Sequence, residues 1–373
     1  QSKSEKLAKE LLADADRPRV ENFRKAAEDL LVLIGVLPSA DAGLLEDLEN
    51  LTVHGDGSIF CSGASPRGQA ACDCLFRGIS NCGHPRYYTS ATAEWCYDHA
   101  HDVFVFGDRY YHIVATQNGH DFPLITYMGA GNESDYTLSL KAADRLIKII
   151  AEHRIPARLS YFCGDGHHDS YAHYYYLLEK GIVPVIPLAK ESRAVSPHLP
   201  DSPETKFDRN GVPLCPGGKP MRRHGFDKKK NVHVFNCPAK CPTRKNGKYI
   251  YVTDKTKCPA QKICDPKSAM GPFVRIRADT DPRLFPPLPR DSRKFRDIMK
   301  QRSGSERCNA LNDRYVSDRV HRSAERNFFR LILANIIIHA VIRHSEAAKK
   351  KLLSGGKSPP PGKDPPAKTA AAS

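Results

Sequence analysis

The sequence lacks any charge-free apolar run of about 20 residues, the length that a membrane-spanning helix needs. Its best candidate, Phe328–Ile342, is interrupted by Arg330, Asn335 and His339. We therefore expect no membrane partner and read this segment as a buried core helix. The start of the chain carries no secretory signal. Because the chain begins at Gln1 rather than Met, a further segment, such as a DNA-binding module, could precede it.

Cysteine is sparse for a secreted disulfide scaffold, with 12 residues in a chain of 373. A chain of this length corresponds to roughly two to three domains and can build a core without disulfides. No internal repeat is visible. We therefore expect reduced, metal-binding or incidental thiols in a cytoplasmic protein.

Acidic residues are too few to balance the basic ones. The chain has 57 Lys and Arg against 42 Asp and Glu, a formal net charge of +15. This surplus favours a polyanionic partner, and we expect nucleic acid rather than the second candidate, an anionic membrane surface. The apolar share of 40% and the charged share of 27% are otherwise typical of a globular protein.

Apolar periodicity predicts that strands and helices alternate after the first fifty residues. We predict strands at 51–60, 103–116, 122–128, 158–163 and 183–188. We predict helices at 134–153 and 169–180, and mostly helical structure at 295–343. The sequence Asn-Gly-His-Asp at 118–121 indicates a hairpin turn. This order predicts an α/β fold with a mixed sheet flanked by helices.

Composition divides the chain into segments. Residues 190–290 are rich in Pro, Lys, Arg and Cys, and we expect an insertion with little core of its own. We predict an N-terminal helical segment at 1–50, a first part of the core at 51–190 with a Cys/His-rich insert at 61–102, a basic Cys-rich insertion at 191–294, a C-terminal helical part of the core at 295–344, and a disordered basic Pro/Ala tail at 345–373.

Three carboxylates occupy unusual positions in this layout. Asp56 lies in the first strand between two glycines, Asp165 follows the fourth strand between two glycines, and Glu306 lies near the start of the last helical region. Carboxylates that converge stay ionised together only beside a cation, and their oxygens prefer Mg²⁺ or Mn²⁺. Two such ions could support in-line phosphoryl displacement. The alternative is that these are ordinary solvated turn or cap residues.

These motifs resemble those of DDE transposases of bacterial insertion sequences. His-Gly-Asp56-Gly-Ser is similar to the first motif of that family, and Gly-Asp165-Gly-His-His is similar to the second. Glu306, with Arg302 four residues earlier, is similar to the Arg-x-x-x-Glu part of the third motif. Met299 and Asp313 stand where some members have Tyr and Lys, which leaves the subfamily open, as it leaves open whether this copy is active.

The resemblance implies an RNase H-like core and a metal-dependent enzyme that cleaves DNA and transfers the strand. Asp56, Asp165 and Glu306 would be the catalytic residues and would hold two Mg²⁺ or Mn²⁺ ions. The partners would be DNA, as element ends and target, and a second copy in a synaptic complex. The protein would lie in the bacterial cytoplasm, at the nucleoid when bound to DNA. Arg302, Arg307, Arg319 and Arg322 are the candidate DNA-binding residues, although each could be an ordinary helical or solvated residue.

Two groups of cysteines could bind zinc. Cys237, Cys241, Cys258 and Cys264 form two loose knuckles around a hairpin signal at 245–248, and four thiolates could hold a structural Zn²⁺. The alternative is reduced surface thiols. The gaps in the earlier group are more irregular and less typical of a zinc site; its members are Cys61, Cys72, Cys74, Cys82 and Cys96. Cys163 and Cys308 are expected to be buried as small apolar side chains.

Two histidines adjoin the second carboxylate. His167 and His168 could be metal ligands, a proton shuttle or turn residues, and the turn is the favoured interpretation. Two other functions also fit the sequence. The first is a non-catalytic DNA-binding protein that uses the Cys-rich insertion as a zinc module. The second is an RNase H-like nuclease that cleaves without joining.

Overall fold

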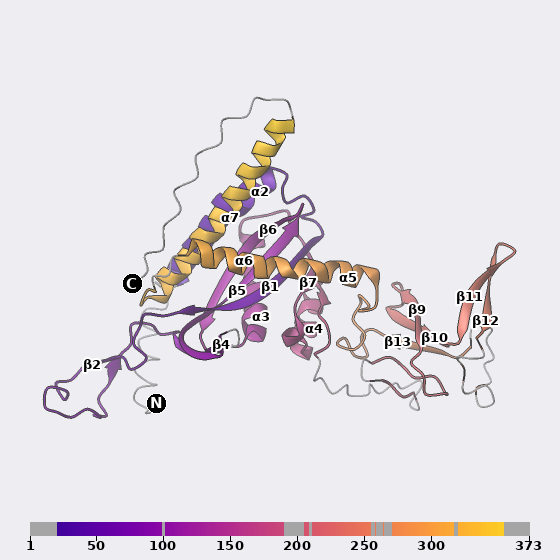
Figure 1. Cartoon of the computed structure of the whole chain (residues 1–373), viewed down its shortest axis with the longest axis horizontal. Coiled ribbons are helices and arrows are strands. Elements are labelled where there is room, and N and C mark those ends of the chain that lie inside the picture. Colours follow the sequence, from indigo (N-terminus) through magenta and orange to yellow (C-terminus); the bar gives the residue numbers. More distant parts are fainter. Residues whose placement is uncertain are drawn as a thin grey trace, which may run out of the picture.

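The computed structural model describes residues 21–98, 101–189, 205–208, 211–254, 258, 264, 271–316 and 320–353. A six-stranded mixed sheet lies at its centre, surrounded by helices (Figure 1). Its strands are β1 (Leu51–Cys61), β4 (Glu94–Asp98), β5 (Val103–Gln117), β6 (His120–Ala130), β7 (Leu159–Cys163) and β8 (Val183–Val185).

The strand order identifies the fold. β6, β5 and β1 are antiparallel neighbours, and β7 and β8 then continue the sheet parallel to β1. β4 pairs with the first residues of β5, beyond the part that pairs with β6. This is the RNase H-like arrangement that the motif resemblance implied, so the predicted mixed sheet flanked by helices is confirmed. The predicted strand at 183–188 is shorter than expected and ends at Val185.

The β5–β6 hairpin forms where the sequence predicts it. Gln117 pairs with His120, and the two residues between them, Asn118 and Gly119, have φ angles of 53° and 77°. Positive φ at both central positions matches the twist of the flanking strands, and Asn-Gly tolerates it better than other pairs. The turn therefore fixes the register of both strands.

Helices cover both faces of the sheet. α3 (Asp135–Glu152) begins at Ser134, whose side chain accepts a hydrogen bond from the backbone N–H of Thr137, and it packs on β1, β5 and β6. α4 (Tyr171–Glu179) follows β7. On the other face lie α6 (Ser303–Tyr315) and α7 (Ala324–Leu353), and α6 crosses in front of β5 and β1 in Figure 1.

Among the described helices, α7 is the one long and apolar enough to cross a membrane. Its buried polar residues show that it packs inside this fold. Asn335 and His339 are fully buried, and they hydrogen-bond to Thr126 Oγ1 at 2.6 Å and to Ser39 Oγ at 2.9 Å. α7 also packs on the N-terminal helical residues, which include η1 (Leu31–Val36) and α2 (Leu37–Asp41). The predicted core helix is therefore confirmed.

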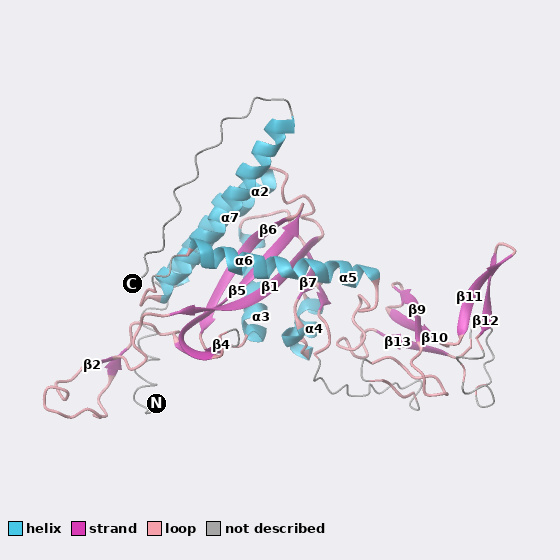
Figure 2. Cartoon of the chain, in the orientation of Figure 1, coloured by secondary structure: helices cyan, strands magenta, loops and turns pink. Residues whose placement is uncertain are grey.

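The Cys-rich insertion has strands and a small apolar cluster of its own. β9 (Arg222–Asp227), β10 (Val232–Asn236) and β13 (Phe273–Arg277) form an antiparallel sheet, and β11 (Lys240–Lys245) and β12 (Lys248–Thr253) form a hairpin. Figure 2 shows these strands apart from the helices of the core. The cluster is larger than the sequence indicated; its buried members are Met221, Phe235, Ile276, Leu284 and Phe285.

Candidate active site

Asp56 and Asp165 come from neighbouring parallel strands. β1 and β7 run side by side with His54 beside Cys163, and each carboxylate lies two residues further along the chain. Because the strands are parallel and in this register, both residues lie at the same level of the sheet, where β7 ends and β1 continues to Cys61. Asp165 lies just past the end of β7, where its Oδ1 accepts a hydrogen bond from the backbone N–H of His167 at 2.9 Å.

Glu306 reaches the same place from α6. It lies in the first turn of that helix, which follows α5 (Arg293–Met299) and the short helix η4 (Lys300–Arg302). One turn further on, Asn309 donates from Nδ2 to Asp56 Oδ2 at 3.0 Å. This hydrogen bond ties the helix that carries the third carboxylate to the strand that carries the first.

Three further contacts fix α6 on the sheet. Asn312 and His112 are both buried, and Asn312 Nδ2 lies 2.6 Å from His112 Nε2. Arg307 pairs with the carboxylate of Asp121 at 2.6 Å and 2.8 Å. Gly304 allows the helix to approach closely, because a Cβ at that position would lie 2.4 Å from an Asp121 carboxylate oxygen. These contacts hold Glu306 in position.

The charges around Asp56 repel its ionised form. Burial, together with the negative charges of Asp135, Glu306 and Asp165, raises the pKa of Asp56 to about 6 against the attraction of Arg302. The three predicted carboxylates are therefore close enough to act on one another electrostatically. A shifted carboxyl group with identified charge partners is a common feature of functional sites.

Arg302 is the basic residue within this group. Its Nη2 donates to Glu306 Oε1 at 2.5 Å, and Asp56 and Asp165 also attract it. Although burial acts in the opposite direction, these carboxylates raise the pKa of Arg302. One guanidinium does not neutralise three carboxylates. The site keeps a negative charge and oxygen ligands, which suits a hard divalent cation such as Mg²⁺ or Mn²⁺.

His168 orients Asp165. It is buried, with Nδ1 2.6 Å from Asp165 Oδ1 and Nε2 2.8 Å from the hydroxyl of Tyr111. His167 is exposed, and its Nδ1 lies 3.0 Å from Asp165 Oδ2. Although burial alone would raise the pKa of Asp165, these two histidines hold it well below its ordinary value. Both histidines lie in the turn after β7, as predicted, and both contact the carboxylate directly.

A fourth carboxylate, Asp135, was not expected from the sequence. It is the first residue of α3, and Arg109 Nη1 lies 3.2 Å from its Oδ1. Its side chain occupies the space above Gly57, where a Cβ would lie 2.2 Å from Asp135 Oδ1. The neighbours of Asp56 therefore include this residue as well. The glycine after Asp56 was the available signal, but the sequence did not show what lies above it.

The remaining predicted DNA-binding residues differ in their surroundings. Arg307 is engaged with Asp121, as described above, and half of its side chain is exposed. Arg322 is exposed. Arg319 lies outside the described residues. Their contact with DNA stays a prediction.

The structure brings some of the predicted zinc ligands together and leaves others apart. Cys72, Cys74 and Cys82 lie together with His84 and could hold a metal ion such as zinc. Cys61 is exposed and Cys96 is buried, with its thiol 3.6 Å from the Val105 carbonyl oxygen, and neither belongs to this group. Within the described residues, the insertion cysteines do not form a comparable cluster, so zinc there stays a prediction; they are Cys237, Cys241, Cys258 and Cys264. Cys163 and Cys308 are buried, as predicted.

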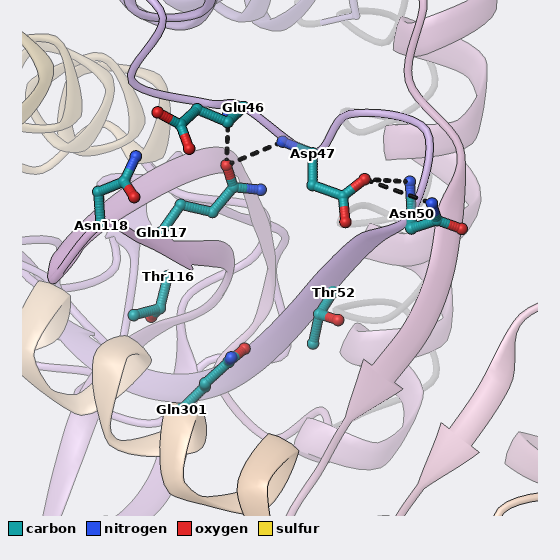
Figure 3. Close-up of a pocket in the computed structure, with 8 residues that line it drawn as sticks. All are labelled: Glu46, Asp47, Asn50, Thr52, Thr116, Gln117, Asn118 and Gln301. Atoms are coloured by element: carbon teal, nitrogen blue, oxygen red, sulfur yellow. Dashed lines mark hydrogen bonds between the residues drawn. The ribbon is translucent and has the colours of Figure 1, made fainter. Parts of the chain in front are cut away.

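A polar cavity of about 240 Å³ lies near the start of β1 (Figure 3). Gln301 and Thr52 line it, but Asp56, Asp165 and Glu306 do not. Gln117 Oε1 accepts hydrogen bonds from the backbone N–H groups of Glu46 and Asp47, at 2.6 Å and 3.4 Å. Because no Lys or Arg lines it, the cavity does not suit a phosphate group. The carboxylate group is the better candidate for an active site.

Comparisons with known proteins add a distant structural likeness. No protein-family model matches the sequence, and no curated protein sequence matches it. Four chains of solved structures match. One is the cryo-EM structure of a piggyBac transposase synaptic complex with hairpin DNA, with 12% sequence identity and a TM-score of 0.34. The match covers 83% of this chain and 49% of that chain, so this chain spans about half the length of its neighbour. At that TM-score the likeness carries no argument about function.

Proposed function

We propose that this chain is a DNA transposase of the DDE type, which cleaves DNA and joins the cut strand to a target. The observation that carries the proposal is the convergence of Asp56, Asp165 and Glu306 from β1, the end of β7 and α6. The element type, a bacterial insertion sequence, is proposed from the motif resemblance alone. Residues 51–190 and 295–344 would form the catalytic core, and residues 191–294 the insertion.

The donor set fits the metal that such an enzyme needs. All three groups are carboxylates, which Mg²⁺ and Mn²⁺ prefer over sulfur or imidazole ligands. Ions held by these residues would supply charge neutralisation and an activated oxygen nucleophile. The protein would position the scissile phosphodiester, and Arg302 would turn from Glu306 to a phosphate oxygen when DNA binds.

Basic surface supports a polyanionic partner. The net charge of the chain is +15. The β11–β12 hairpin projects from the insertion (Figure 1) and carries Arg244, Lys245 and Lys248 next to Tyr249, which is 73% exposed. Lysine and arginine can contact phosphates, and an exposed aromatic ring can stack on a base. We propose that this hairpin contacts DNA and that two copies of the chain hold two element ends.

The test uses the full chain and duplexes made from the DNA that flanks its coding sequence. In Mg²⁺ or Mn²⁺ the protein should cut one strand at a fixed position and join the new 3′ end to a second duplex. Asp165→Asn should bind the same duplex and do neither, because Asn keeps a hydrogen-bond acceptor for His168 but removes a charged metal ligand. Asp144→Asn, a change on α3 away from the site, should react as the parent does.

Each alternative function has its own outcome in this assay. Cutting without joining would indicate a nuclease. DNA binding that a chelator weakens, with no cutting in Mn²⁺, would indicate a zinc-dependent binding protein. Equal cutting by Asp165→Asn and the parent would refute the proposed catalytic residues.

A further inference from the structure

The segment between β1 and β4 leaves the central sheet as a finger (Figure 1). Its two-residue strands β2 (Gln69–Ala70) and β3 (Arg86–Tyr87) pair antiparallel, with Ala70 opposite Arg86. Continuing that register inward brings Cys72 opposite His84. The pairing therefore closes a loop of residues 71–85 and places both of its ends side by side.

The closed loop has almost no apolar core. Its large apolar side chains point outward: Phe76 is 93% exposed, Leu75 is 68% exposed and Ile79 is 51% exposed. Within residues 71–85, the one buried side chain is Cys74. Two backbone pairs and one buried thiol do not offset the conformational entropy of ordering such a loop. Another source of stability is needed.

Four ligand atoms meet inside the loop. The sulfur atoms of Cys72 and Cys82 are 3.4 Å apart, and the sulfur of Cys74 lies 3.2 Å from His84 Nδ1. All four ligand atoms, the three sulfurs and one nitrogen of His84, lie within 4.8 Å of one another. Tetrahedral zinc, with Zn–S near ~2.3 Å and Zn–N near ~2.1 Å, places its ligand atoms roughly 3.5 to 3.8 Å apart. The 3.2 Å and 3.4 Å pairs are slightly closer than that, and no pair of the four exceeds 4.8 Å. A disulfide, with an S–S bond of about 2.05 Å, does not fit the Cys72–Cys82 separation.

We propose that Cys72, Cys74, Cys82 and His84 bind one Zn²⁺ ion, which folds residues 71–85 into a rigid finger. Three sulfurs and one imidazole nitrogen are a ligand set typical of structural zinc. Because the protein supplies all four ligands, the ion has no open position for a substrate, and its role is structural. Binding supplies the folding energy that the loop lacks. This site does not depend on the carboxylate site, and either can fail without the other.

The first test measures zinc bound to the purified full chain by mass spectrometry. Cys82→Ser should contain one equivalent less zinc than the parent, whereas the control Cys61→Ser should contain the same amount as the parent. Comparison between variants removes any contribution from zinc elsewhere in the chain. Equal zinc content in all three proteins would overturn the proposal.

The second test works even where Cys82→Ser fails to fold. The parent is stripped with a chelator, incubated with or without Zn²⁺, and treated with N-ethylmaleimide, and labelling is mapped by peptide mass spectrometry. Zinc should protect Cys72, Cys74 and Cys82 by tenfold or more and leave the exposed Cys61 labelled at the same rate. Equal labelling of the three cysteines with and without zinc would overturn the proposal.

Discussion

Replacing Asp56 with Asn should stabilise the metal-free protein while it abolishes activity. Burial and the neighbouring carboxylates raise the pKa of Asp56 from its ordinary value of 3.8 to about 6. Two pKa units correspond to about 3 kcal/mol of unfavourable free energy for the ionised form. Because Asp56 keeps some contact with solvent, we expect a gain of about 2 kcal/mol in the free energy of unfolding. Asn can still accept the hydrogen bond from Asn309.

The pH dependence of this gain has a definite sign. The folded-state pKa of Asp56 lies above its unfolded-state value, so the stability of the parent falls as the pH rises from about 4 to about 6. Below pH 4 the carboxyl group is protonated in both states. The advantage of Asp56→Asn should therefore be full at pH 7.5 and close to zero at pH 4.

Mg²⁺ should reverse the order of stabilities. The parent gains about 2.7 kcal/mol when the ion is present at 100 times its dissociation constant. Asp56→Asn lacks one charged ligand and should gain little. The matched control is Asp313→Asn on α6, where burial alone raises the pKa of the carboxyl group. That variant should respond to Mg²⁺ as the parent does.

The assay is urea unfolding at pH 7.5 and pH 4, in EDTA and in Mg²⁺. The reasoning predicts that Asp56→Asn is the more stable protein in EDTA and the less stable one in Mg²⁺. It would be refuted if the variant were less stable than the parent in EDTA at pH 7.5, or if both proteins gained equally from Mg²⁺.

Three further predictions concern the surroundings of the site. Asp135→Asn removes a charge that repels ionised Asp56, so NMR titration should show a lower pKa for Asp56. Calorimetry should show Mg²⁺ binding weakened severalfold but not abolished. An unchanged pKa of Asp56 would contradict this. Gly304→Ala places a Cβ 2.4 Å from an Asp121 carboxylate oxygen, so it should cost about 1 to 3 kcal/mol of stability in urea unfolding and weaken Mg²⁺ binding by shifting α6. Its control is Ala310→Ser, at an exposed position of the same helix, which should change neither quantity; equal effects of the two variants would contradict the close approach. Burial lowers the pKa of His54 and His339 to about 4 and of His112 to about 3. Their folded-state pKa values lie below the unfolded value, so acidification from pH 7 to pH 5 should lower the free energy of unfolding by roughly 2 kcal/mol for each histidine. Asp56 and Asp108, whose raised pKa values act in the opposite direction, should partly offset this loss. Unchanged urea midpoints over this range would refute the account.

The sequence predicted the core of the fold because its signals are local. Apolar periodicity located α3 and the long strands, and Asn118-Gly119 located the hairpin between β5 and β6. Asp56 lay within one predicted strand and Asp165 followed another, each between two glycines, and the predicted α/β sheet suggested that they could meet at one edge. Glu306 had the weakest local signal of the three, its position near the start of the last helical region, and the resemblance of Arg302 and Glu306 to the third motif supported it.

Other features depend on contacts between distant residues. Asp135 joins the site only because α3 begins above Gly57, and no local pattern shows that. Asn312 with His112, and Asn335 with Thr126, are polar pairs inside the core that apolar periodicity cannot reveal. The Cys₃His cluster depends on a pairing of two-residue strands that are too short to predict.

The most direct test of the central claim is a crystal structure of the full chain with Mn²⁺, with the ion located by its anomalous scattering. Our account predicts manganese bound between the carboxylates of Asp56, Asp165 and Glu306. Manganese bound elsewhere, with these three side chains directed away from one another, would contradict it.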